Sequence, residues 1–447
     1  MSTPFGFGPG TGGGEGSGGS GDPFGLGAFG DPSQMAEAFA QIGRLLSWQG
    51  GPVNWDLARD TARQAVAGGD PSPSFGDRSL VEQALRLAEL WLDDATTLPA
   101  AGGRVEAWSR AEWVERTLPV WHELAEPVAE RVQEAMTAAL RDQLSGAGAE
   151  GLPPGMEGLL GAGVSPETFA QQLQSQLGPM LKAMSASMFG AQVGQALGAL
   201  AGEVVGSTDV GLPLAGTGRS ALLPSGVAAF GAGLEVPEEE VRVFLALREA
   251  AHQRLYAAAG WLRPRLLGDV TAYARGIAID AAAIESAVSQ LDPSDPAAVQ
   301  EALGSGLFAP DPTPEQQLAL TRLETLLALV EGWVDTVTAA AAEPHLKHAA
   351  ALREAVRRRR ATGGPAEQTF ANLVGLELRP RRLRDAARLW ELVARARGTD
   401  GRDALWTAPD LMPGTSDLDE PELFASTSSV EVDLDELLGP DGDGPQA

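Results

Sequence analysis

One segment sets charged residues into an apolar run with a spacing that could support metal chemistry. It reads Arg-Glu-Ala-Ala-His over residues 248–252, with apolar residues on both sides of it in the sequence. On a helix, positions 248 and 252 lie one turn apart and share a face. In the His-Glu-x-x-His motif, two histidines with this spacing bind zinc, and the glutamate acts as the base toward the metal-bound water. Glu249 and His252 match that motif, whereas Arg248 stands where the first histidine would be.

A second pair of charges, Glu331 and Asp335, shares one helix face inside the apolar run 320–337. In zinc sites whose third ligand is a glutamate, that carboxylate comes from a later helix, so Glu331 is the candidate. The alternative is a pair of helices joined by buried salt bridges, because charged groups buried among apolar ones need partners. The residues alone leave both interpretations open.

The remaining histidines offer few further ligands. His345 and His348 follow Pro344 and are three residues apart, so both could face inward, or both could be surface groups at a helix start. His122 has no partner in the sequence and is interpreted as structural. The absence of cysteine excludes disulfide scaffolds, cysteine zinc sites and thiol catalysis. There is no Gly-x-Ser-x-Gly nucleophile elbow either.

The net charge limits the classes of molecule that the protein is expected to bind. The 447-residue chain carries a formal net charge of −27, which argues against binding of nucleic acid or of an anionic membrane by the whole surface. No leader of a charged, an apolar and a small-residue segment opens the chain, and we therefore expect a cytoplasmic protein. We expect no membrane association.

The hydrophobic periodicity predicts a mainly α, multi-helix fold with at most a small β element. A strand or two is expected within 209–233, around residues 211–214 or 221–223, and nothing indicates an extended sheet. Proline and glycine are expected to separate the helices. The expected helices include 79–95, 120–144, 166–177, 180–205, 237–260, 268–290, 296–303, 314–342, 346–362, 365–373 and 380–398.

Four glycines, at positions 190, 194, 198 and 202, fall on one stripe of the helix predicted for 180–205. Such a stripe could be a membrane-type helix interface. Polar residues interrupt the segment, however, and favour the close packing of two helix backbones in a protein core.

The composition divides the chain into three parts. Residues 1–31 are glycine-rich and are expected to be disordered, 32–409 form a helical domain with a Gly/Pro-rich loop at about 146–163, and 410–447 form a disordered acidic tail. The tail has 11 acids and no base, whereas residues 353–403 have 13 arginines against 7 acids. The tail could therefore lie against the arginine-rich helices. A basic patch masked in this way would also suit regulated nucleic-acid binding, but aromatics for base stacking are not evident there.

The stretch from about Gly190 to Phe424 resembles an actinobacterial family of zincin-like metallopeptidases. The strings that carry the resemblance are GAQVGQALG at 190–198, DVGLP at 209–213, REAAHQRL at 248–255, LVEGWVD at 329–335, LELRP at 376–380 and LWTAPDLMP at 405–413. The resemblance implies a mostly helical zincin-like domain and a zinc-dependent hydrolase acting on peptides or proteins. It also implies that His252 and Glu331 are metal ligands and that Glu249 is the general base.

Arg248 departs from this pattern, because a guanidinium is permanently cationic and has no lone pair for zinc. Either another group, such as His345 or His348, supplies the missing ligand, or the site is catalytically inactive. For an inactive site we predict that Arg248 replaces the metal by bridging to Glu331, with Glu249 or Asp335 as further partners. The competing functions are a zinc metallopeptidase, a metal-free zincin-like binding or scaffold protein, and an unrelated helical interaction protein.

Overall fold

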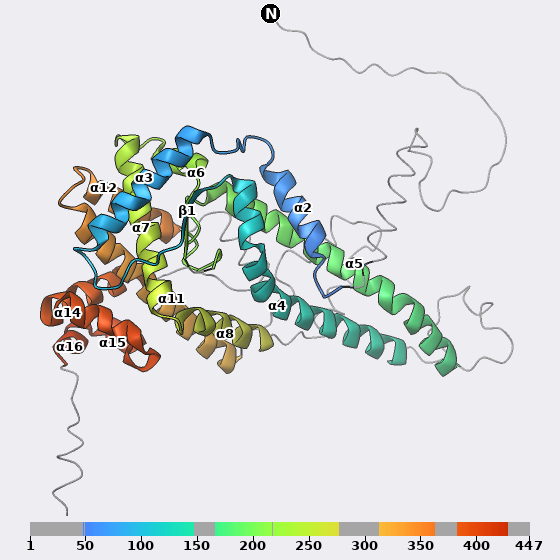
Figure 1. The fold of residues 1–447 in the computed structure, drawn as a ribbon. Helices are drawn as coiled ribbons and strands as arrows, with labels where there is room; N and C mark the ends of the chain where they lie inside the picture. Colours follow the sequence, from blue (N-terminus) through green and yellow to red (C-terminus); the bar gives the residue numbers. More distant parts are fainter. Residues whose placement is uncertain are drawn as a thin grey trace, which may run out of the picture. The chain divides into compact units, whose positions relative to one another are not determined.

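The structure is a computed structural model and describes residues 48, 50–146, 166–216, 218–276, 313–362 and 382–427. Helices make up most of these residues (Figure 1). The predicted mainly α fold is confirmed. The expectations for residues 1–31, 147–163, 296–303 and 365–373 lie outside the described residues. The helices discussed below are α2 (Trp55–Val66), α3 (Phe75–Leu92), α4 (Arg110–Gly146), α5 (Pro166–Glu203), α6 (Pro224–Gly231), α7 (Glu238–Ala258), α8 (Leu262–Arg275), α11 (Pro314–Ala342), α12 (Ala349–Thr362), α14 (Leu383–Ala404), α15 (Thr415–Asp419) and α16 (Pro421–Ser426).

Helices α7 and α11, each of which contains a long stretch without any exposed residue, carry the charged residues singled out by the sequence. Every residue of 243–256 in α7 and of 326–338 in α11 is buried. Helix α11 begins with a capping box, in which Thr313 and Gln316 each accept a hydrogen bond from the other's backbone N–H. It lies against α7, α8, α12 and α14. Charged side chains in these stretches must therefore find their partners within the protein.

Helix α11 is also long and apolar enough to cross a membrane. Yet 83% of its most apolar window is buried within the described fold. A helix that is apolar on all sides is typical of a protein core as well as of a membrane. The packing around α11 accounts for its composition as a central core helix.

The predicted small β element is a two-stranded parallel sheet of β1 (Arg104–Ala107) and β2 (Arg219–Leu222). Strand β2 overlaps the predicted run 221–223, whereas β1 was not predicted. The strands meet at a close backbone approach, since a Cβ on Gly103 would lie 2.0 Å from the carbonyl oxygen of Gly218. Gly103 also has a positive φ of 88°, which glycine adopts at little cost.

Two predicted helix breaks at proline are wrong. Helix α4 runs through Pro119 and Pro127. Helix α5 runs through Pro179, so the predicted helices 166–177 and 180–205 are one continuous helix. A proline inside a helix removes one backbone hydrogen bond and crowds the preceding turn, at a cost of about 3 kcal/mol or more. Tertiary packing of a long helix can offset that cost, and α4 and α5 do lie against each other.

The glycine stripe packs closely against another helix, as predicted, at three of its four positions, and at Gly190 and Gly194 the nearest atom is a backbone oxygen. Helix α2 lies along α5 (Figure 1). A Cβ added to Gly190, Gly194 or Gly198 would lie 2.4, 2.5 or 2.6 Å from atoms of residues 54, 58 and 65. A Cβ on Gly202 would meet nothing within 4 Å. The glycines thus let α2 and α5 approach more closely than any side chain would allow.

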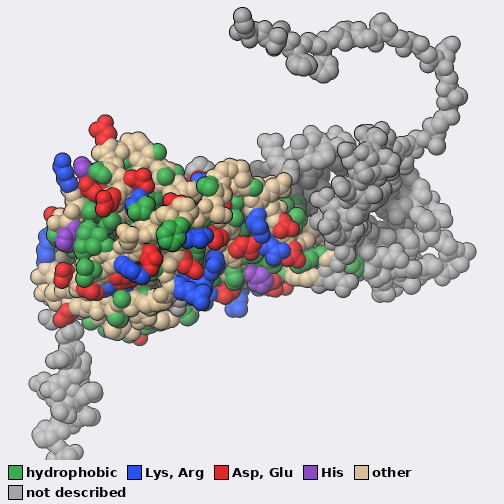
Figure 2. Space-filling view, turned by 45° about the horizontal axis from the view of Figure 1, so that its top comes forward, with side chains coloured by type: hydrophobic (Ala, Val, Ile, Leu, Met, Phe, Trp, Pro, Cys, Tyr) green, Lys and Arg blue, Asp and Glu red, His purple; other side chains and the backbone are tan. Residues whose placement is uncertain are grey.

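The prediction that the chain is disordered from residue 410 is wrong for residues 410–427. Helices α15 and α16 continue the ordered chain to residue 427 and pack on α14. Leu418 and Ala425 are buried there, and Arg382 pairs with Asp419 at 2.7 Å. Ion pairing with the arginine-rich helix, combined with burial of a few apolar groups, orders this part of the acidic segment. Acidic and basic side chains are likewise interspersed over the described face in Figure 2.

Candidate functional site

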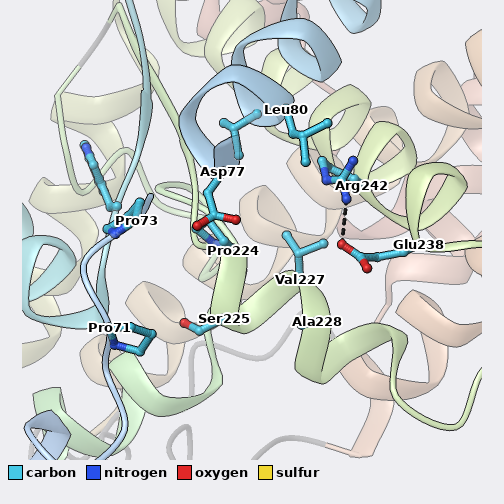
Figure 3. A pocket seen from close by; sticks show the side chains of 12 residues that line it. Pro71, Pro73, Asp77, Leu80, Pro224, Ser225, Val227, Ala228, Glu238 and Arg242 are labelled. Atoms are coloured by element: carbon cyan, nitrogen blue, oxygen red, sulfur yellow. Dashed lines mark hydrogen bonds and ion pairs between the residues drawn. The ribbon is translucent and has the colours of Figure 1, made fainter. Parts of the chain in front are cut away.

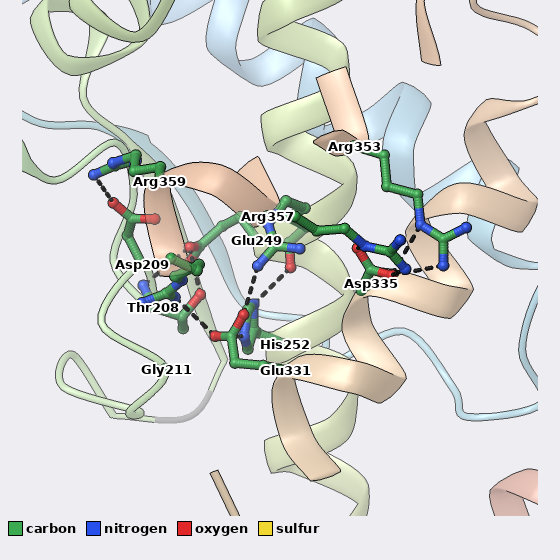
Figure 4. Close-up of polar contacts among 12 residues, drawn as sticks. Thr208, Asp209, Gly211, Glu249, His252, Glu331, Asp335, Arg353, Arg357 and Arg359 are labelled. Atoms are coloured by element: carbon green, nitrogen blue, oxygen red, sulfur yellow. Dashed lines mark hydrogen bonds and ion pairs between the residues drawn. The ribbon is translucent and has the colours of Figure 1, made fainter. Parts of the chain in front are cut away.

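The core of the candidate site is an ion cluster centred on Glu331, where α7 and α11 face each other (Figure 4). Arg248 Nη2 donates to Glu331 Oε2 at 2.7 Å, and His252 Nε2 lies 3.1 Å from Glu331 Oε1. The side chains of Arg248 and Glu331 are 7% and 1% exposed. The predicted contact between Arg248 and Glu331 is confirmed.

A second arginine, which the sequence analysis missed, completes the cluster. Arg360 of α12 donates from Nη2 to Glu331 Oε1 at 2.7 Å, and its side chain is 8% exposed. Glu331 therefore contacts two guanidinium groups and one imidazole. The available signal was the run of four arginines at 357–360, which indicated only a basic patch without showing which member faces inward.

The two arginines govern the ionisation of Glu331. Burial by itself would raise the pKa of this carboxyl group, but the charges of Arg360 and Arg248 outweigh that effect, and His252 adds to them. The pKa of Glu331 is consequently held far below its usual range. Glu331 is ionised wherever the protein is folded under ordinary conditions.

His252 is fixed at both ring nitrogens. Its Nδ1 lies 2.9 Å from the backbone carbonyl oxygen of Arg248, and its Nε2 faces Glu331. Both partners are acceptors, so both hydrogen bonds form together only when each ring nitrogen carries a proton. The ring also stacks at 6.3 Å on Tyr256, whose hydroxyl donates to the carbonyl oxygen of Gly211.

Glu249 lies in a separate network of neutral donors. The hydroxyl groups of Ser207 and Thr208 donate to it, as does the Thr208 backbone N–H at 3.0 Å. Gln253 Nε2 and the Ala221 backbone N–H add contacts at 3.3 and 3.4 Å. The suggested pairing of Arg248 with Glu249 is not among the contacts of the described residues. Both oxygens of Glu249 are already engaged as acceptors.

Two glycines make room for these carboxylates. A Cβ on Gly206 would lie 2.7 Å from Glu249 Oε2, and one on Gly211 would lie 3.1 Å from Glu331 Oε1. Gly211 has a positive φ of 82°, so its backbone also requires glycine. The segment that carries both residues is tied down by Asp209, which accepts from the Val205 backbone N–H and pairs with Arg359 at 2.8 Å.

Asp335 forms its own pair of salt bridges one turn along α11. Arg353 and Arg357 of α12 each approach Asp335 Oδ2 at 2.6 Å. The suggested contact between Arg248 and Asp335 is therefore wrong. Asp335 is already satisfied by two other cations.

The histidines offered as substitute ligands lie elsewhere. His345 is exposed and stacks on Trp91 at 4.2 Å, and His348 binds Glu240 at 3.0 Å. His122 packs against Trp55 and, contrary to the expectation that it has no partner, lies 3.2 Å from Glu126 one turn along α4. Among the described residues, no group of three or more His, Asp or Glu side chains is arranged to hold a metal ion.

The comparisons with known proteins agree with this fold. The sequence model of the zincin-like metallopeptidase family matches residues 53–425, most of the chain. The chain belongs to the zincin-like metallopeptidase family. A protein from Chloroflexus aurantiacus, described as a candidate hydrolase with a novel fold, has a similar structure, with a TM-score of 0.56 and 17% identity. The similarity covers 83% of this chain and 97% of that one. A search of curated proteins found no match.

Zinc does not fit the residues present in this zincin-like chain. His252 and Glu331 are close enough to share an ion, but the first position of the motif is the Arg248 guanidinium, which has no lone pair to offer. Arg360 contacts the same Glu331 oxygen that His252 faces. A dication would have to enter between two permanent cations, Arg248 and Arg360, which would repel it.

The cluster predicts a specific acid sensitivity. The folded pKa of Glu331 is depressed below its ordinary value of 4.5, so its ionised form stabilises the fold above about pH 4.5, and that contribution is lost as the pH falls further. In urea unfolding across an acid pH series, Glu331→Gln should show a shallower fall of the unfolding free energy than the wild type. The exposed Glu315→Gln is the control and should follow the wild-type profile. Equal slopes for Glu331→Gln and the wild type would contradict the assignment.

Proposed function

We propose that this protein is a metal-free member of the zincin-like family and acts as a binding or scaffold protein. The observation that carries the proposal is the joint contact of Arg248 and Arg360 with Glu331, at 2.7 Å each. Together the two guanidinium groups bring the same formal charge as a zinc dication. The cluster thus keeps the charge balance around Glu331, whereas the Lewis acid that activates water in zinc peptidases has no ligand set.

The state of Glu249 supports the same conclusion. A general base must have an oxygen within hydrogen-bond reach of the proton that it takes. The oxygens of Glu249 instead accept hydrogen bonds from Ser207 and Thr208, and the residue is 3% exposed. We infer that Glu249 has a structural role, in which it holds the segment after α5 against α7.

The second candidate is a zinc-dependent peptidase acting on peptides or proteins. Family membership and the 3.1 Å separation of His252 Nε2 and Glu331 Oε1 favour it. The two candidates differ in one measurable property, the zinc content of the protein.

We expect protein purified without a His tag to hold far less than one zinc per chain by elemental analysis. Arg248→His alone should gain little affinity, because Arg360 still occupies Glu331. Arg248→His combined with Arg360→Leu should bind zinc more tightly than either single variant, because it restores the motif and removes both competing cations.

The matched control pairs Arg248→His with Arg358→Leu. Arg358 is also on α12, but its side chain is 74% exposed and pairs with Glu354. This control should bind no more zinc than Arg248→His alone. Stoichiometric zinc in the wild type that is lost in His252→Ala would overturn the proposal and restore the peptidase.

A further inference from the structure

A hollow between α3, α6 and the start of α7 is distinct from the ion cluster and shares no residue with it (Figure 3). Its volume is about 250 Å³. Sites for small-molecule ligands usually begin at roughly 300 Å³. An open hollow just below that size suits one or two side chains of a docked peptide better than an enclosed cofactor.

Much of the lining is apolar and conformationally restricted. Pro71 and Pro73 form one side, and Pro224 begins α6 next to them. Val81 and Val227 are buried beneath the hollow, so its apolar floor belongs to the core. Prolines have fixed φ angles and no backbone N–H, which makes this wall rigid and unable to donate hydrogen bonds.

An exposed apolar side chain of α3 forms part of the hollow. Leu80 lines it and is 43% exposed. The Ser225 hydroxyl also lines the hollow and is buried without a hydrogen-bond partner in the described chain. Exposed apolar groups beside an unsatisfied polar atom are typical of a surface that another molecule covers.

The charges around the hollow select the class of partner. Asp77 and Glu238 line it together with one cation, Arg242, which already pairs with Glu238 at 2.6 Å. The neighbouring Glu235 and Glu239 are exposed. Asp77 stays ionised, because hydrogen bonds from Ser74 lower its pKa. A partner that carries basic groups is therefore attracted to the hollow, and a partner that carries acidic groups is repelled.

We propose that the proline-walled hollow docks a basic, apolar peptide segment of another protein, with an apolar side chain between Leu80 and Pro224 and a Lys or Arg toward Asp77 and Glu238. The net charge of −27 steers such a cationic partner toward the protein. The proposal assigns a partner class to the proposed binding function and rests on that function for its biological role.

The probe is a phage-displayed library of random peptides selected on the whole wild-type protein. Selected peptides should combine an apolar residue with Lys or Arg. Their affinity, measured by fluorescence polarisation, should fall as salt is added and should fall for the same peptides with Glu in place of each basic residue.

Two pairs of matched variants locate the binding. Leu80→Ser should weaken binding by about tenfold, as expected for loss of an anchor side chain. Leu318→Ser removes a comparably exposed leucine from α11 and should change nothing. Glu238→Gln should weaken binding by several-fold through loss of one attractive charge, whereas the exposed Glu315→Gln should not.

Other outcomes would overturn the docking site. These are the absence of any enriched peptide, enrichment of acidic peptides, equal binding by Leu80→Ser and the wild type, and concentration-dependent self-association through the hollow. The zinc content of Leu80→Ser should equal that of the wild type in every case. A failed docking site therefore leaves the metal-free cluster standing, and a zinc-loaded protein leaves the docking test intact.

Discussion

Replacing Glu331 by alanine should be among the most damaging single changes in this protein. It leaves Arg248 and Arg360 buried, with no carboxylate between them. Breaking a buried ion pair by removing one partner costs about 3–5 kcal/mol, and here two cations lose the same partner. We expect a loss at or above that range in urea unfolding, together with a clear drop in melting temperature.

Companion variants separate unpaired charge from lost volume. Arg248→Ala should cost less than Glu331→Ala, because Arg360 still pairs with Glu331. Replacing all three residues by apolar ones of similar volume should recover much of the loss, since a well-packed apolar substitute for a buried ion cluster is often neutral or better. Glu391→Ala is the surface control, because its partner Arg353 keeps Asp335. A loss below 1 kcal/mol for Glu331→Ala would contradict the assigned role.

The helix pair α2–α5 gives the second large expected effect. Gly194→Leu should destabilise the protein by about 1–3 kcal/mol or more, because overpacking forces backbones apart. A Cβ at Gly194 would lie 2.5 Å from the Ala58 carbonyl oxygen, and a backbone atom cannot rotate away as a side chain can. Thermal unfolding followed by circular dichroism would measure the loss.

The same helix supplies the control for this change. Gly202 lies on the same stripe but meets nothing within 4 Å. Gly202→Ala should leave stability unchanged or raise it by up to about 1 kcal/mol, because alanine favours a helix more than glycine does. If both positions respond alike, helix propensity rather than close approach explains the stripe.

Local pattern predicted those parts of the molecule that local physics decides. The apolar run from Pro314 to Ala342 predicted α11 at its observed bounds. The contact of Arg248 with Glu331 followed from two features of the sequence. Each residue lies in an apolar run, and a charge buried there must be paired with an opposite one.

Long-range geometry decided what the sequence could not. Nothing local distinguishes Arg360 from its neighbour Arg358, yet one is buried on Glu331 and the other is largely exposed. Strand β1 was missed because its four residues gain their structure by pairing with a strand more than a hundred residues away. The early start assigned to the tail had the same cause, since its acids Asp419 and Glu422 pair with Arg382 and Arg388, at the N-cap and within α14.

The composition of α11 also bears on how the chain is sorted during synthesis. A nascent segment of this length and hydropathy resembles a membrane anchor before its partner helices exist to cover it. Glu331 and Asp335 lie inside its apolar run, and an aspartate at the centre of a membrane span costs about 2.5–3.5 kcal/mol. The carboxylates that bind the arginines of the folded protein thus also oppose insertion of α11 into a bilayer. Once α12 has folded against α11, the arginines of α12 neutralise both carboxylates, which lipid tails cannot do.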